Sequence, residues 1–153
     1  MASFLNLSET NWSYYTIPAA FGLCMLPHFY AIKLAGKNYD LGNPRKTEEL
    51  CAKDTTMDKV TLRRISRAKA AAANGFETLA LYAVAVVAGN VSGLPAGRLN
   101  ALTLGYLASR AVYNLIYVRL QDNARAAVLR PLVWMAGIGI IMSLFISAGR
   151  DVN

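Results

Sequence analysis

The uneven distribution of charge along the chain constrains its fold more than any other sequence feature. Of the 25 charged residues (16 Lys and Arg, 9 Asp and Glu), fifteen lie between Lys33 and Lys69, whereas only seven lie between Ala70 and Gly149. A soluble helical protein carries charge along the outer face of every helix. The chain is short, at 153 residues, and 55% hydrophobic. This pattern predicts a single domain that is embedded in a membrane.

Four segments approach the roughly 20 apolar residues that cross the hydrocarbon core of a bilayer. They are residues 12–32, 70–89, 99–118 and 131–149. We therefore expect an all-α protein, in which residues 1–153 form one bundle of four transmembrane helices with connections at 33–69 and 119–130. The first span is long and contains proline, and no Lys or Arg precedes it, so we expect it to be retained rather than cleaved as a signal peptide.

The basic residues predict how the bundle is oriented. Ten Lys and Arg lie in residues 33–69 and three in 119–130, against one, Arg98, between the second and third spans. The positive-inside rule puts the two basic connections in the cytosol and both termini outside. The membrane is then that of the endoplasmic reticulum in a eukaryote or the inner membrane in a bacterium. Basic residues beside spans contact anionic lipid, so the net charge of +7 does not indicate a nucleic-acid partner.

Individual proline, aspartate, cysteine and histidine residues predict local features of the bundle. Pro18 and Pro27 predict a kinked first span in which neighbouring helices satisfy the carbonyls that proline leaves free. Asp58 is a candidate N-cap for a helix of about 30 residues, long enough to project beyond the hydrocarbon. Cys24 and Cys51 have no second Cys or His at metal-ligand spacing, so we expect a core residue and a loop thiol and no metal site. His28 is interpreted as a packed side chain.

Polar side chains inside the second and third spans are the candidates for chemistry. Asn74 and Glu77 share a helical face, with Arg67 seven residues earlier. A carboxylate at membrane depth is costly, so Glu77 must face a polar cavity or a partner, and a purely structural pair with Arg110 is the alternative.

The third span carries a second polar set, whose spacing of i, i+3, i+4 and i+7 predicts one face. Its members are Arg110, Tyr113, Asn114 and Tyr117. Arg125 and Arg130 follow just before the fourth span. Guanidinium groups, a carboxylate, amides and phenols suit a small zwitterionic or anionic ligand.

Several motifs resemble one known family. The segment 67–77, Arg-Ala leading to Asn-x-x-Glu, is similar to the second-helix signature of the MAPEG family, the membrane-associated proteins in eicosanoid and glutathione metabolism. Arg110, Tyr113 and Tyr117 resemble its third-helix pattern. Residues 129–134 resemble the entry to its fourth helix, and residues 43–45 are similar to the first loop of microbial and fungal members.

The resemblance implies a homotrimer that binds glutathione between subunits near the cytosolic face. Arg67, Asn74 and Glu77 would hold the peptide, with Arg110, Tyr113, Asn114 and Arg125 completing the binding site. Arg130, assisted by Tyr117, would stabilise the thiolate, because a nearby cation lowers the pKa of a thiol. A position at the start of the fourth helix would add free amide groups that favour an anion.

Two features differ from the leukotriene-forming and microsomal transferase members. Ala70 stands where those proteins have an arginine, and Arg67 matches the bacterial-like branch instead. The third connection looks longer than theirs, so either Arg125 or Arg130 could be the thiolate partner.

Three functions fit these features. The first is a glutathione-dependent transferase or peroxidase acting on a lipophilic substrate that enters from the bilayer. The second is a glutathione-independent isomerase or cyclase of a biosynthetic pathway on the same fold. The third is a non-catalytic scaffold that binds lipid.

Overall fold

The computed structural model describes residues 6–151, without the side chains of residues 124, 125 and 151, and its regular structure is entirely helical. This confirms the all-α prediction. The elements in chain order are α1 (Ser13–Ala35), the 3-10 turns η2 (Gly36–Asn38) and η3 (Pro44–Lys46), α2 (Thr47–Lys53), α3 (Lys59–Val91), α4 (Ala96–Leu115), the π-helical turn η4 (Ile116–Leu120) and α5 (Ala124–Asp151).

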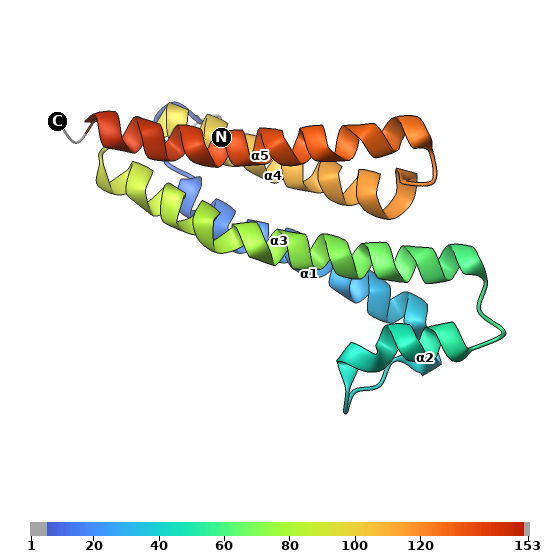
Figure 1. Cartoon of the computed structure of the whole chain (residues 1–153). Coiled ribbons are helices and arrows are strands. Elements are labelled where there is room, and N and C mark those ends of the chain that lie inside the picture. The colour runs from blue at the N-terminus through green and yellow to red at the C-terminus, as the bar shows by residue number, and fades with distance from the viewer. Residues whose placement is uncertain (1–5, 152–153) are drawn as a thin grey trace.

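The four long helices form the bundle, in which α1 packs mainly on α3, and α4 on α5 (Figure 1). Short α2 lies to the side, beside the ends of α1 and α3. We call the end that carries residues 36–58 and the turn 121–123 the basic end. The opposite end, which carries the start of α1, the end of α5 and the connection from α3 to α4, is the far end. The α3–α4 connection turns at Gly93, whose φ of 78° favours glycine.

Within residues 6–151, three helical segments are long and apolar enough to cross a membrane: Ser13–Asn38, Lys59–Val91 and Ala126–Arg150. The fourth helix of the bundle, α4, is more polar because it carries Arg98, Asn100, Arg110 and Asn114. Asn100 and Arg110 are turned into the protein, 1% and 4% exposed. The polarity of α4 is thus partly hidden from the surroundings, as four helices in a bilayer require.

Two local predictions are confirmed. The side chain of Asp58 accepts hydrogen bonds from the amides of Val60 and Thr61, which caps α3. In α1, Pro27 has no N–H for the carbonyl of Leu23, and Nδ2 of Asn114 donates to that carbonyl at 2.9 Å. A neighbouring helix therefore satisfies the group that proline leaves free.

Close packing holds the helices in register. A Cβ on Gly75 would lie 2.8 Å from Sγ of Cys24, so α1 and α3 approach each other at a glycine. Farther along, the rings of Tyr82 and Tyr106 stack at 3.9 Å in the core. Their hydroxyls pair with Thr16 and Thr78 respectively, so the buried phenols have partners.

The structure corrects the predicted connections. Residues 119–130 were expected to be a loop, but only 121–123 lie outside a helical segment, since Ala124–Leu129 contains good helix formers and no Gly or Pro. Arg130 therefore lies inside α5 and not beside its free amides. Cys51 is also not a loop thiol: it lies on α2 and is fully buried, which raises its pKa.

Candidate functional site

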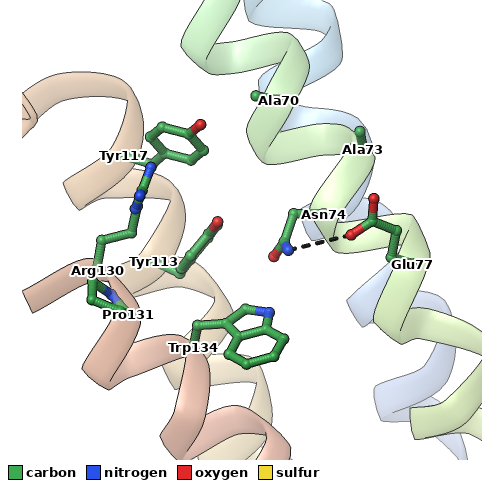
Figure 2. A pocket seen from close by; sticks show the side chains of 9 residues that line it. All are labelled: Ala70, Ala73, Asn74, Glu77, Tyr113, Tyr117, Arg130, Pro131 and Trp134. Carbon is green, nitrogen blue, oxygen red and sulfur yellow. Dashed lines mark hydrogen bonds between the residues drawn. The ribbon is translucent and has the colours of Figure 1, made fainter.

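A groove of about 460 Å³ opens near the basic end, between α3 on one side and α4, η4 and α5 on the other (Figure 2). We call it the polar groove. It is lined by Ala70, Ala73, Asn74, Glu77, Tyr113, Tyr117, Arg130, Pro131 and Trp134. All nine predicted site residues belong to elements that meet here, and five of them line the groove.

The α3 wall follows helical spacing, with lining residues at i, i+3, i+4 and i+7. Ala70 and Ala73 have small side chains, which leaves space between this wall and the opposite one. Nδ2 of Asn74 lies 3.5 Å from Oε2 of Glu77, a long contact. Glu77 is exposed in the single chain although it lies well inside α3. A charged group at that depth requires a ligand or a second chain against it.

The opposite wall is aromatic and cationic. Tyr113 and Tyr117 meet edge to face, with ring centroids 5.7 Å apart. The guanidinium of Arg130 stacks over the ring of Tyr117 at 4.5 Å. Tyr117 lies in the π-helical turn η4, and such turns occur frequently at functional sites because they redirect side chains.

Several polar atoms in this groove have no partner among the described residues. Arg130 makes no ion pair there, and Nε1 of Trp134 is buried without a hydrogen bond. Figure 2 shows Arg130 and Trp134 on one wall and Glu77 on the other. Buried donors normally have acceptors, so the groove offers both donors and a carboxylate to a bound molecule.

Arg110 lies behind the wall and does not line the groove. It is 4% exposed, its guanidinium stacks over Tyr113 at 4.5 Å, and its Nη2 donates to Oδ1 of Asn74 at 3.0 Å. Arginine can only donate, so Oδ1 of Asn74 must face it, which turns Nδ2 toward Glu77. Among the described residues Arg110 and Glu77 both contact Asn74 rather than each other, so the direct pair is not formed.

Arg67 is held at the basic end by the turn between η4 and α5. Its Nη2 donates to Oδ1 of Asp122 at 2.9 Å, and Arg63 lies 3.6 Å from the same oxygen. The hydrogen bond from Arg67 lowers the pKa of Asp122. Arg67 is not a lining residue of the polar groove, although its Nη1 is buried without a partner among residues 6–151.

Two other predicted site residues, Asn114 and Arg125, are not among the lining residues of the polar groove. Asn114 was expected on the face of Tyr113 and Tyr117, but its amide points to the carbonyl of Leu23 on α1, so this expectation was wrong. Neighbouring positions on a helix diverge by 100°, and α1 lies on that other side. Arg125 is in the first turn of α5, and its side chain falls outside the described residues.

Sequence reasoning did not assign Trp134 to the site. It follows Arg130 by four residues on α5, so the same spacing argument that grouped the α3 residues would have found it. His28 lies in a separate small cavity, beside Lys69 and Tyr39. Among the described residues no group of His, Cys, Asp or Glu could hold a metal ion.

Apolar helices around a polar groove define an integral membrane protein of four-helix architecture. The sequence profile of one family, described as the MAPEG family, matches residues 15–150. The chain belongs to the MAPEG family, and the motifs on α3, α4 and α5 that resemble it are those that meet at the groove. No curated protein and no solved structure matches the chain.

Proposed function

We propose that this protein is a glutathione-dependent transferase or peroxidase that acts on a lipophilic substrate, with glutathione bound in the polar groove. One observation carries the proposal. Helices distant in sequence bring a carboxylate, an amide, phenols and an unpaired guanidinium into one groove inside an apolar bundle. Such a set is costly in an apolar bundle unless a polar ligand or a neighbouring chain completes it.

Glutathione fits this inventory. It is a tripeptide with one ammonium group, two carboxylates, amide bonds and a thiol. Glu77 would accept from the ammonium group, and Nδ2 of Asn74, oriented by Arg110, would donate to a peptide or carboxylate oxygen. The indole N–H of Trp134 adds a further donor. Arg67, fixed by Asp122 beyond the groove, would add long-range attraction for the carboxylates.

Arg130 would act on the thiol. A guanidinium that stacks on Tyr117 keeps its N–H groups free for an anion, and a cation beside a thiol favours the thiolate, which is the nucleophile. The thiol proton leaves to water. In the transferase reaction the sulfur bonds to an electrophilic carbon as the bond from that carbon to its leaving group breaks. In the peroxidase reaction the sulfur bonds to one peroxide oxygen as the O–O bond breaks, the released alkoxide takes a proton from the hydroxyl of Tyr117, and a second glutathione converts the sulfenic acid to the disulfide and water. The lipophilic substrate would reach the groove from the bilayer.

The exposed Glu77 also supports assembly. A second copy that covers the groove would shield this carboxylate from lipid, so we propose a homotrimer in which each groove is closed by a neighbour. The basic end would face the cytosol, as the ten Lys and Arg of residues 33–69 favour. The membrane would be the endoplasmic reticulum in a eukaryote or the inner membrane in a bacterium.

Arg130→Leu tests the proposal. We expect turnover of a glutathione-dependent model reaction to fall by about 10²-fold, because the lost interaction stabilises charge in the reacting state. The ultraviolet absorbance of the thiolate, measured on mixing with glutathione, should disappear. Arg150→Leu, at the other end of the same helix, is the control and should keep both signals.

Three results would count against this assignment. Full activity in Arg130→Leu together with loss of activity in Arg125→Leu would show that Arg125, and not Arg130, stabilises the thiolate. Turnover that is equally low in Arg150→Leu would indicate a general loss of structure. A wild-type protein that neither binds glutathione nor forms the thiolate would exclude the glutathione-dependent reaction and favour the isomerase or scaffold function.

A further inference from the structure

A second groove lies between α1 and α4, and it shares no lining residue with the polar groove. Its volume is about 260 Å³. Its lining is largely apolar: Leu23, Leu26, Pro27, Tyr30, Ala111, Asn114, Leu115, Val118 and Arg119. The amide of Asn114 is already engaged with the carbonyl of Leu23. We call this the α1–α4 groove.

The α1–α4 groove is hollow at Ala111, a small residue that lies between the larger side chains of Leu115 and Leu26. Ala111 is exposed on α4, and Leu115, one turn farther along, is 55% exposed. Leu26 faces it from α1 and is 60% exposed. In an integral membrane protein, exposed leucines that flank a hollow lie against lipid chains or a second copy.

The side chain of Arg119 places a positive charge where the α1–α4 groove meets the basic end. Arg119 is exposed, and its guanidinium lies 4.9 Å above the ring of Tyr30. No ion pair joins Arg119 to any acid in residues 6–151. The six acids of the basic end are engaged elsewhere. Four form ion pairs, Asp122 with Arg67, Asp54 with Lys37, Glu48 with Lys69 and Glu49 with Lys53, while Asp40 accepts from the amide of Gly42 and Asp58 caps α3.

A second copy would not supply the missing anion, because it would bring the same engaged acids. The exposed Glu77 is at the wrong depth. Arg110 bonds to Asn74, which puts those two residues at one level of the bundle. Arg119 lies nine residues beyond Arg110 toward the basic end, roughly 13 Å along the helix, whereas Glu77 lies in the opposite direction. Copies with the same orientation therefore keep these two groups apart.

We propose that the α1–α4 groove binds an anionic phospholipid of the leaflet at the basic end. One acyl chain lies in the hollow beside Ala111, and the phosphate binds Arg119. A planar guanidinium pairs well with phosphate, and stacking on Tyr30 fixes its orientation at the mouth of the groove. The site combines an apolar hollow of about 260 Å³, which has room for part of an acyl chain, with an unpaired cation at its mouth, which a zwitterionic lipid satisfies less well.

The test is native mass spectrometry of the full-length protein, purified in mild detergent with an equimolar mixture of phosphatidylglycerol and phosphatidylcholine. The wild type should retain phosphatidylglycerol preferentially. Arg119→Gln should lower that preference about fivefold, which corresponds to about 1 kcal/mol at 25 °C. Arg45→Gln, another exposed arginine of the basic end, is the matched control and should leave the preference unchanged. Ala111→Phe fills the hollow without changing charge and should reduce lipid retention.

Each opposite result would overturn the proposal. Equal losses in Arg119→Gln and Arg45→Gln would mean diffuse attraction to basic residues and no site. Unchanged retention in Ala111→Phe would mean that no chain occupies the hollow. Dissociation of an oligomer in Ala111→Phe, with no phospholipid retained by the wild type, would mean that a second copy fills the groove.

Discussion

Two polar layers cross the bundle, one at the far end and one at the polar groove, and only the first is closed by hydrogen bonds within the chain. At the far end, Nδ2 of Asn11 donates to Oδ1 of Asn90, and Nδ2 of Asn90 donates to the hydroxyl of Ser13. At the groove, among the described residues, the carboxylate of Glu77 has only the long contact to Asn74, and the guanidinium of Arg130 has only the ring of Tyr117.

Asn100 shows how complete the far-end layer is. Its Oδ1 accepts from the amide of Trp12 at 2.8 Å, and its Nδ2 donates to the carbonyls of Leu7 and Thr10, each at 2.7 Å. The segment before α1 is thereby fixed onto α4. Nε1 of Trp12, at the edge of this layer, is buried without a partner among the described residues, so the hydrogen bonds of the layer satisfy its amides and the hydroxyl of Ser13 but not this indole.

This difference in hydrogen bonding distinguishes polar residues that stabilise the fold from polar residues that are available to a ligand. A polar group in an apolar medium costs free energy unless it is hydrogen-bonded, so a closed layer can serve stability alone. An open layer in the middle of the helices, such as that at the polar groove, is costly in the isolated chain. It is explained by a ligand or a neighbouring subunit that completes it, which is the basis of the proposed glutathione site.

The largest expected effect on stability comes from opening the closed layer. Asn100→Leu removes three hydrogen bonds and leaves backbone groups unsatisfied, so we expect the free energy of unfolding in detergent to fall by about 2–4 kcal/mol. Thermal unfolding monitored by circular dichroism measures it. A variant as stable as the wild type would show that the layer does not hold the segment before α1.

A smaller loss is expected where α1 and α3 touch. Gly75→Ala places a Cβ 2.8 Å from Sγ and 3.4 Å from Cα of Cys24, so the helices must shift, at a cost of about 1–3 kcal/mol. Cys24→Ala in the same chain removes the sulfur and should recover part of the loss. Additive effects of the two substitutions, measured by the same unfolding assay, would contradict direct contact at this point.

The smallest effect is a pH dependence confined to the basic end. Hydrogen bonds from Asn38 and Thr56 lower the pKa of Asp54, and those from Thr61 and Val60 lower the pKa of Asp58. A carboxyl whose pKa is lower in the folded state stabilises it above the unfolded pKa, near 3.8, and loses this contribution as the pH falls further.

We therefore expect residues 36–58 to loosen progressively as the pH falls below about 4, while the far-end layer, which is made of neutral amides and hydroxyls, stays closed. Hydrogen–deuterium exchange, corrected for the intrinsic pH dependence of amide exchange, measures this. An equal increase in amide exchange at both ends would contradict the conclusion that carboxylates stabilise the basic end and neutral hydrogen bonds stabilise the far end.

The presence of the four long helices and five of the residues that line the polar groove could be predicted from the sequence, because both depend on the spacing of residues within one helix. Asp58, as a candidate N-cap, predicted the start of α3, and the i, i+3 spacing predicted that Asn74 and Glu77 lie on one face. Positions whose roles depend on tertiary contacts were harder to predict. Asn114 satisfies a carbonyl that Pro27 leaves free, and Arg67 pairs with Asp122, 55 residues later. No periodicity within one helix contains that information.

The turn before α5 shows another limit. The sequence 119–130 contains three arginines and no long apolar run, so a hydropathy argument makes it a connection. Helix propensity instead extends α5 back to Ala124, and the π-helical turn η4 extends α4 forward. As a result Arg130 reaches the groove from the interior of a helix, one turn before Trp134.

The most direct test of the open layer is calorimetric titration of glutathione into the wild type and Glu77→Gln, with thermal unfolding measured on both. We predict that the wild type binds glutathione and that Glu77→Gln weakens binding about 10-fold or more without loss of stability, because the carboxylate accepts from the ligand's ammonium group and holds no helix in place. Absence of binding to the wild type, or a variant that loses stability and keeps its affinity, would contradict the account.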